Sequence, residues 1–301
     1  EAIERSGYDS LWVYDHFHTT PLPSQEATHE AWTLMAALAA STTRVRLGQM
    51  CTCVAYRPPA YLAKVAATVD VISGGRLNLG IGAGWYQHEY EGYGYEFSRP
   101  AVRIGQLREA IEIMRRMWTE DEVHFAGKHY RLHGAICRPK PIQQPYLPIW
   151  VAGGGEQLTL RVAARYASHT NFGPTPEEFA RRSAVLADHC REAGTDFDAI
   201  VRSTNRFVVC RPTEREVQEA LAAIKDRYLR VVPEQQAERA TSLYREMAGT
   251  PDQLVERLRP WAAAGLAYAI VYFPDAAYDP SGLELFAREG ARVVVTGRRA
   301  E

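Results

Sequence analysis

The segment Gly74-Gly-Arg-Leu-Asn-Leu-Gly-Ile-Gly-Ala-Gly-Trp85 decides the expected fold of this chain. Within it, Leu77, Leu79 and Ile81 alternate with asparagine and glycine, and the run then breaks into a loop rich in glycine and aromatic residues. Alternation with a period of two predicts a short buried strand that ends at a binding surface. The glycine spacing is not the Gly-x-Gly-x-x-Gly fingerprint of dinucleotide-binding proteins.

The glycines at the end of this strand, Gly80, Gly82 and Gly84, allow two interpretations. Without a Cβ, they let a flat ligand or a phosphate lie against bare backbone. They also relieve crowding inside a barrel or beneath a helix. The sequence leaves both interpretations open.

Working outward from this segment, six other stretches are typical of strands, at 11–15, 45–51, 149–152, 168–172, 205–210 and 269–273. Helical periodicity fills the intervals between them, and an eighth strand would fit before residue 1. Repeated strand-helix units predict a parallel sheet closed as a (β/α)8 TIM barrel, with an open doubly wound sheet as the alternative.

We expect one barrel domain over residues 1–301 that lacks its first strand in this chain. Residues 119–147 interrupt the alternation of strands and helices, with a hairpin at 123–132 followed by a proline-rich arm. The sequence therefore predicts an insertion after the fourth strand-helix unit that covers one side of the core.

Composition narrows the class of partner. Lys and Arg (35) nearly balance Asp and Glu (36), which leaves no broad basic face for nucleic acid or anionic lipid. Five scattered cysteines are typical of a reduced, cytoplasmic protein, and no histidine cluster or second pair completes a metal site with Cys51 and Cys53. No apolar run approaches the ~20 residues of a membrane span. We expect a small-molecule substrate, no metal, and neither a nucleic-acid nor a membrane partner.

In a barrel, function lies at the carboxyl ends of the strands. These ends carry Asp15-His16, Met50-Cys-Thr-Cys53, Gly82-Ala-Gly-Trp85 and Ala152-Gly-Gly-Gly155. Glycine, backbone amides and aromatic rings suit a flat ring and a phosphate better than a pair of water-activating carboxylates. The glycine run after Ala152 is expected to lead into a helix near Glu156, whose N-terminal amides and dipole would hold a phosphate.

Three features of these strand ends bear on function, and two of them, His16 and the aromatic residues, keep two interpretations each. His16 is either a proton donor to the reacting group or a core histidine held by Asp15. His88 is placed to reach back over the glycine loop to a phosphate. The aromatic residues that begin at Trp85 either form a wall for the substrate or cofactor, or simply pack the loop down.

Four segments in this order resemble the luciferase-like monooxygenase family, and within it the oxidoreductases that depend on coenzyme F420, an 8-hydroxy-5-deazaflavin. They are Gly7-Tyr-Asp-Ser-Leu-Trp-Val-Tyr-Asp-His16, Thr43-Arg-Val-Arg-Leu-Gly48, Ala66-Ala-Thr-Val-Asp-Val-Ile-Ser-Gly-Gly-Arg-Leu-Asn-Leu-Gly-Ile-Gly-Ala-Gly-Trp85 and Pro148-Ile-Trp-Val-Ala-Gly-Gly-Gly155. The resemblance implies a (β/α)8 barrel with F420, or alternatively FMN, across the strand ends, and a homodimer.

The resemblance also implies roles for particular residues. His16 would act close to the reactive ring, with Asp15 as its acidic neighbour, and a non-prolyl cis peptide bond is expected near Met50-Cys51. The residues expected to bind the cofactor fall in three groups: Met50, Cys51 and Cys53 beside the ring; Gly82, Ala83, Gly84 and His88 around the ribityl phosphate; and Ala152, Gly153, Gly154 and Gly155 in the second phosphate loop.

Two departures from the family pattern bear on the substrate. Trp85 stands where the sugar-phosphate dehydrogenases of this family carry an acidic glutamate, and no lysine or arginine after Asn171 or Phe273 matches their phosphate-binding residues. A fairly apolar substrate that stacks on Trp85 and Tyr56 is therefore expected in place of glucose 6-phosphate. The alternatives are an FMN-dependent monooxygenase that uses molecular oxygen and a non-catalytic flavin-binding protein.

Overall fold

A computed structural model describes residues 2–20 and 22–290 of the chain. The chain divides into two compact units. Unit 2 comprises 9–171 and 184–200, and unit 1 comprises 1–8, 172–183 and 201–301. The prediction of one barrel domain over the whole chain stays a prediction.

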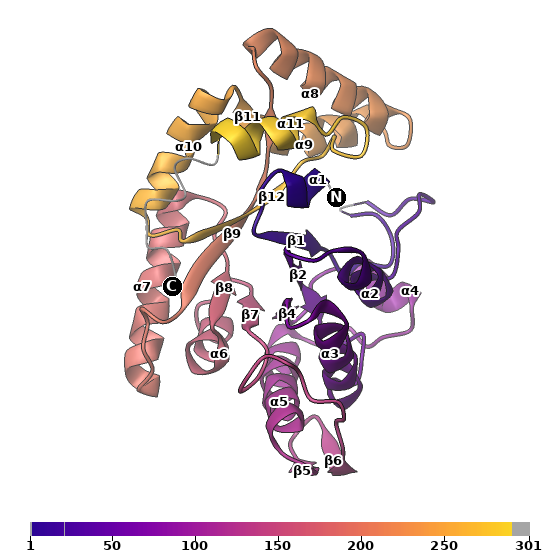
Figure 1. Cartoon of the computed structure of the whole chain (residues 1–301), viewed down its shortest axis with the longest axis vertical. Coiled ribbons are helices and arrows are strands. Elements are labelled where there is room, and N and C mark those ends of the chain that lie inside the picture. The colour runs from indigo at the N-terminus through magenta and orange to yellow at the C-terminus, as the bar shows by residue number, and fades with distance from the viewer. Residues whose placement is uncertain (1, 21, 291–301) are drawn as a thin grey trace. The chain divides into compact units, whose positions relative to one another are not determined.

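Unit 2 is built on a parallel sheet in the order β1-β2-β4-β7-β8 (Figure 1). The short strand β3 also pairs with β4. All six residues of β4 are buried, because helices cover parallel strands on both faces. The bounds of these strands are β1 Ser10–Val13, β2 Arg46–Gln49, β3 Thr52–Cys53, β4 Leu77–Gly82, β7 Ile149–Ala152 and β8 His169–Asn171.

Helices follow the strands of unit 2 as the sequence predicts, and α3 packs against both α2 and α5. Pro59 and Pro100 occupy the first turns of α3 and α5, where proline costs no hydrogen bond. The helix bounds are α2 Ala31–Ser41, α3 Pro59–Ser73, α4 Gln87–Gly92, α5 Pro100–Thr119 and α6 Thr159–Tyr166, and α7 Pro176–Ala193 has residues in both units.

The interruption after α5 is an antiparallel hairpin of β5 Val123–Ala126 and β6 Arg131–Ala135 (Figure 1). The buried carboxylate of Glu109 on α5 accepts hydrogen bonds from the backbone amides of Lys128, His129 and Tyr130, which fixes the turn of the hairpin. The arm that follows is held by Asp70 on α3, whose Oδ2 accepts the backbone amides of Ile142 and Gln143.

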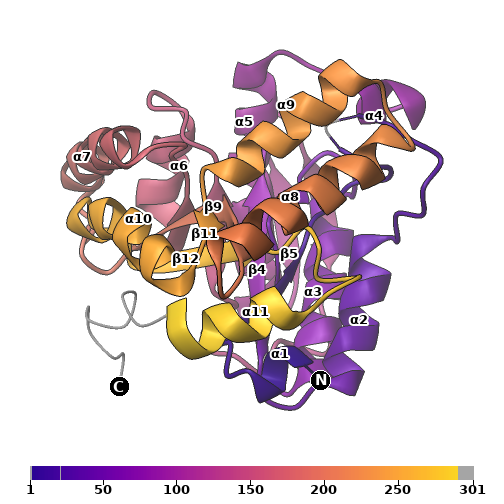
Figure 2. The same ribbon diagram turned by 90° about the horizontal axis from the view of Figure 1, so that it is seen from above.

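Unit 1 contains two parallel pairs, β9 with β12 and β10 with β11, and its helices α8 and α9 lie side by side (Figure 2). No helix in the described part of the chain is both long and apolar enough to cross a membrane. The remaining bounds are α1 Ala2–Arg5, β9 Val201–Phe207, β10 Val209–Cys210, α8 Glu214–Leu229, α9 Glu234–Arg245, β11 Ala248–Gly249, α10 Pro251–Ala263, β12 Tyr268–Tyr272, α11 Ser281–Leu285 and a π-helical turn Phe286–Gly290.

Candidate active site

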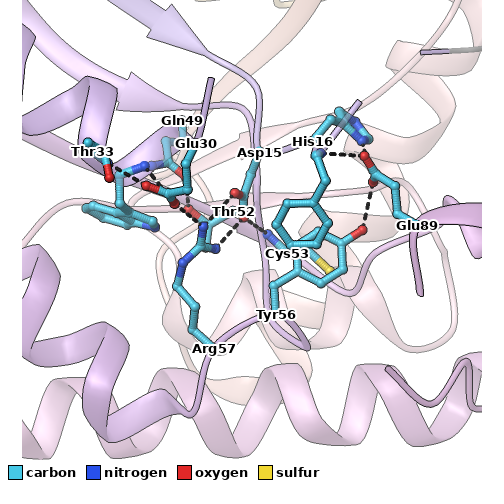
Figure 3. Close-up of polar contacts among 12 residues, drawn as sticks. Asp15, His16, Glu30, Thr33, Gln49, Thr52, Cys53, Tyr56, Arg57 and Glu89 are labelled. Carbon is cyan, nitrogen blue, oxygen red and sulfur yellow. Dashed lines mark hydrogen bonds and ion pairs between the residues drawn. The ribbon is translucent and has the colours of Figure 1, made fainter. Parts of the chain in front are cut away.

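Asp15 and His16 follow β1 and direct their side chains into two different networks (Figure 3). Asp15 is 3 % exposed and accepts the backbone amide of Cys53 at 2.9 Å. The Arg57 guanidinium pairs with both of its oxygens, at 2.8 and 3.0 Å, and also contacts Glu30, which caps the N-terminus of α2. Asp15 therefore fastens the segment after β2 to the end of β1, and its expected catalytic role stays a prediction.

The carboxylate that contacts His16 belongs to Glu89 on α4 and not to the neighbouring Asp15. Its Nδ1 lies 2.8 Å from Oε2 of Glu89, and the Tyr56 hydroxyl donates to the same oxygen at 2.8 Å. Oε1 of Glu89 accepts the backbone amides of Phe17 at 2.6 Å and His18 at 3.4 Å. The Glu89 carboxylate is fully buried and satisfied by four donors.

Two opposing effects set the ionisation of Glu89. Burial acts to raise the pKa of this carboxyl, but hydrogen bonds from His16 and Tyr56, together with the charge on His16, outweigh it and lower the pKa. Glu89 is thus ionised at neutral pH. Sequence reasoning missed this residue, and only its place four residues after Trp85, just beyond the glycine loop, signals it.

Aromatic rings surround the exposed side of His16. Trp85 is 61 % exposed, stacks on Tyr86 with ring centroids 5.1 Å apart, and meets His16 edge-on at 5.8 Å. Among the described residues, Nε2 of His16 has no hydrogen-bond partner. An exposed indole beside an available imidazole nitrogen forms a surface on which a flat or apolar substrate can rest. The expected contact of Trp85 with substrate stays a prediction.

His88 is exposed on α4, and its Nδ1 lies 3.0 Å from Nε2 of His18. The ring is thus placed in the loop as the sequence predicts, although its expected contact with a phosphate stays a prediction.

Tyr56 differs from its expected role as a stacking surface. Its side chain is only 6 % exposed and packs in a cluster with Cys53 and Tyr90. A ring enclosed in this way cannot stack on substrate, because both faces are covered by protein. Tyr56 instead contributes its hydroxyl to Glu89.

The strand-end glycines relieve crowding, which answers one question that the sequence left open. A Cβ on Gly80 would lie 1.8 Å from the carbonyl oxygen of Gln49, and one on Gly82 would lie 2.7 Å from Sγ of Cys51. Gly84 has φ +76°, and its Cβ would lie 2.0 Å from the Tyr90 hydroxyl. Packing alone therefore accounts for glycine at these positions, and the cofactor contacts expected of Gly82, Ala83 and Gly84 stay predictions.

The peptide bond between Met50 and Cys51 is cis, as the resemblance implies. Burial raises the pKa of the Cys51 thiol to about 12, and burial likewise raises that of Cys53 to about 11, so both are thiols at neutral pH. Within 2–20 and 22–290, no three His, Cys, Asp or Glu side chains are grouped closely enough to hold a metal ion. The cofactor contacts expected of Met50, Cys51 and Cys53 stay predictions.

The second glycine loop begins where β7 ends, but its expected geometry needs a correction. The following helix, α6, begins at Thr159 and not near Glu156, because residues 156–158 form a turn. The glycines therefore do not form the first turn of the helix. Gly153, with φ +115°, and Gly155 are exposed and present backbone at the carboxyl end of β7, while Ala152 and Gly154 are partly buried. Phosphate binding by this loop stays a prediction.

A family model described as luciferase-like monooxygenase matches residues 1–268. The chain belongs to this family. An F420-dependent glucose-6-phosphate dehydrogenase from Gordonia bronchialis is 31 % identical over 91 % of this chain and 85 % of that protein. A second F420-dependent glucose-6-phosphate dehydrogenase, from Amycolatopsis mediterranei, is 37 % identical over 56 % of this chain. This match spans about half (49 %) of that relative's length.

Two further similar proteins are named for different cofactors, one for FMNH(2) and one for F420. An FMNH(2)-dependent dimethylsulfone monooxygenase from Pseudomonas putida is 29 % identical over 74 % of this chain and 60 % of that protein. A solved F420-dependent secondary alcohol dehydrogenase, in complex with an F420-acetone adduct, superimposes with a TM-score of 0.78 at 22 % identity, covering 97 % of this chain and 92 % of that one. The predicted family, its (β/α)8 fold class and the prediction of an enzyme are confirmed.

Proposed function

We propose that the chain is an oxidoreductase that uses coenzyme F420 to pass hydride to or from a small, fairly apolar organic substrate. The coenzyme is the one for which the Gordonia and Amycolatopsis relatives are named. The single observation that carries the chemistry is the contact of exposed Trp85 with partly buried His16, a histidine that is held by a buried carboxylate and leaves one ring nitrogen available.

The residues present fit a flat ring that carries a phosphate chain. The exposed backbone of Gly153 and Gly155 leaves room for a phosphate at the end of β7, and the indole of Trp85 offers an aromatic surface. The ring of His16 meets Trp85 edge-on, and among the described residues Nε2 of His16 has no hydrogen-bond partner. We therefore assign the ring to the His16 and Met50-Cys51 side and the phosphate to the residue 153–155 loop.

When bound, the deazaflavin supplies or accepts the hydride. Reduction of a C=O or C=C bond by hydride also requires a proton. The doubly protonated ring of His16 gives that proton to the substrate from Nε2, and in the reverse direction the neutral ring takes it up at Nε2. Trp85 holds an apolar substrate against this nitrogen and excludes water from it. Arg57 and Asp15 keep the Met50–Cys53 segment in place.

The first experiment is a pair of titrations of the purified protein, one with F420 and one with FMN, followed by tryptophan fluorescence. We expect F420 to bind the more tightly. Turnover is then measured on apolar ketones and enones and on glucose 6-phosphate. Oxidation of glucose 6-phosphate would overturn the proposed substrate class but leave the coenzyme in place.

The role of His16 is tested by His16→Ala, which should lower kcat about 10²- to 10⁴-fold, the usual contribution of a general acid or base, with little change in coenzyme Kd. The control is His124→Ala, the same change on the exposed β5–β6 hairpin, which should leave both constants unchanged. Equal activity of His16→Ala and the wild type would end this assignment.

The relative named for FMNH(2) favours a second candidate, a monooxygenase that consumes oxygen. Preferential FMN binding with oxygen uptake during turnover would establish this alternative. Tight F420 binding without turnover across the substrate panel would instead favour a non-catalytic flavin-binding protein.

A further inference from the structure

The two oxygens of Glu89 accept different kinds of donor. Among the described residues, Oε1 accepts hydrogen bonds only from the backbone amides of Phe17 and His18, and Nδ1 of His18 lies farther away, at 4.0 Å. A backbone N–H cannot exchange its role for that of an acceptor. Oε2 accepts Nδ1 of His16 and the hydroxyl of Tyr56, two groups that can each either donate or accept. The partners of Oε1 can therefore only donate, whereas the partners of Oε2 can change from donor to acceptor.

An ionised carboxylate can only accept hydrogen bonds. The 2.8 Å contact between Oε2 and Nδ1 therefore requires the proton to be on Nδ1, so that in the neutral ring Nε2 carries the lone pair. The ring is further restrained by edge-on contacts with Trp85 and Tyr86.

We propose that Glu89 is a positioning residue that fixes neutral His16 in the Nδ1-protonated tautomer and so makes Nε2 the atom that exchanges a proton with the substrate. The tautomer is set by contacts within this chain and does not depend on bound coenzyme or substrate. Its part in proton transfer rests on the proposed function.

Replacing Glu89 by glutamine should reverse the tautomer. The backbone amides of Phe17 and His18 hold the amide oxygen of glutamine on their side, which leaves its NH₂ group facing His16 and Tyr56. The Tyr56 hydroxyl can rotate to accept, and Nδ1 of His16 must then accept as well. The ring proton moves to Nε2, although the side chain keeps nearly the same size and shape.

The test is a long-range ¹H–¹⁵N NMR spectrum of the protein labelled with ¹⁵N-histidine, without coenzyme, at a pH where the ring is neutral. The His16 signals are those that disappear in His16→Gln. In the wild type, Nδ1 should show the shift of a protonated nitrogen and Nε2 that of an unprotonated one. In Glu89→Gln these two shifts should exchange.

Glu91→Gln is the matched control, since it makes the same change on the exposed side of α4, where the Glu91 side chain hydrogen-bonds only with Gln87 among the described residues. Its His16 signals should equal those of the wild type. A wild-type spectrum with the proton on Nε2, or an unchanged tautomer in folded Glu89→Gln, would overturn the proposal. If Glu89→Gln does not fold, the wild-type spectrum decides alone.

Kinetics then separate this inference from the proposed function. If both hold, Glu89→Gln lowers kcat up to about 10⁴-fold, the size of effect known for a wrong tautomer in the Ser-His-Asp triad, with little change in KM. An Nδ1-protonated tautomer in a protein that does not bind F420 would reject the proposed function and leave the tautomer assignment standing. A reversed tautomer with full kcat would reject the role in proton transfer.

Discussion

Replacing Gly84 by alanine should destabilise the protein more than the same change at Gly94. The two glycines have nearly the same left-handed backbone, with φ of +76° and +74°. A Cβ at Gly84 would lie 2.0 Å from the hydroxyl of Tyr90 and 2.7 Å from Sγ of Cys53, whereas a Cβ at Gly94 would have no heavy atom within 4 Å. The pair therefore separates the cost of backbone conformation from the cost of crowding.

The magnitude follows from these two terms. Both variants carry the left-handed penalty, about 1–2 kcal/mol for a residue with a Cβ. Only Gly84→Ala must also displace the buried Tyr90 ring, and forced overpacking of a core costs about 1–3 kcal/mol. Displacing the ring also disturbs the bonds of its hydroxyl to the Ala83 carbonyl and Cys53, each worth about 1 kcal/mol. We expect Gly84→Ala to lower the free energy of unfolding by about 2–4 kcal/mol more than Gly94→Ala does.

Urea unfolding followed by tryptophan fluorescence and by circular dichroism measures this difference, provided that the two transitions coincide. Equal losses in the two variants would refute the crowding argument and restore the interpretation that Gly84 serves only a ligand. Tyr90→Phe removes the nearest clashing atom. Partial recovery of stability in the double variant Gly84→Ala/Tyr90→Phe would further support the crowding argument.

Three further predictions concern the networks around the site. Arg57→Met leaves Asp15 buried without its charged partner, which should cost about 3–5 kcal/mol in urea unfolding. The pKa of Glu89 is lowered from 4.5 in the folded protein, so ionised Glu89 stabilises the fold fully above pH 4.5. This stabilisation is lost as the pH falls through the lower pKa of the folded state. The melting temperature of Glu89→Gln should therefore fall less steeply in acid than that of the wild type. Since burial raises the pKa of Cys51 to about 12, iodoacetamide at pH 8 should label it much more slowly in the native protein than in urea, as measured by peptide mass spectrometry.

Each of these predictions has a contradicting result. Arg259→Met breaks an exposed pair with Glu256 and should cost far less than Arg57→Met, so equal losses would contradict the buried-pair argument. Parallel acid profiles of the wild type and Glu89→Gln would show that the carboxyl titrates alike in the folded and unfolded states. Rapid native labelling would show that Cys51 is an accessible thiolate.

Several strands were predictable because they are short apolar runs, such as Leu77–Gly82 and Ile149–Ala152, and burial on both faces of a parallel sheet demands apolar residues. Each of the seven expected stretches overlaps a strand, but β8 is the polar sequence His-Thr-Asn, and β9 begins at Val201, four residues before the expected stretch. The sequence did not separate β3 from β2 or β10 from β9, because a break of one or two residues leaves hydrophobicity unchanged. The start of α6 was misplaced by three residues, since glycine marks a corner but not the first helical turn.

The resemblance predicted the cis bond after Met50, and the structure has it, whereas the roles of His16 and Trp85 stay predictions. The pairing of the side chains was not predictable: Asp15 turns to Arg57, and the next residue, His16, turns to Glu89. The partner of His16 lies 73 residues away, and Tyr56 was taken for a surface ring although it is enclosed. Such contacts depend on tertiary proximity, which a single sequence does not encode locally.

The short segment after the glycine loop divides into two halves with opposite tolerance to change. Trp85, Gln87 and His88 are exposed, whereas Glu89 and Tyr90 are fully buried and bonded to the segments around them. A mutant library aimed at a new substrate can therefore randomise the exposed half while the buried half preserves the scaffold. Selection on such a library would be expected to recover varied residues at 85, 87 and 88 and the parental pair at 89 and 90.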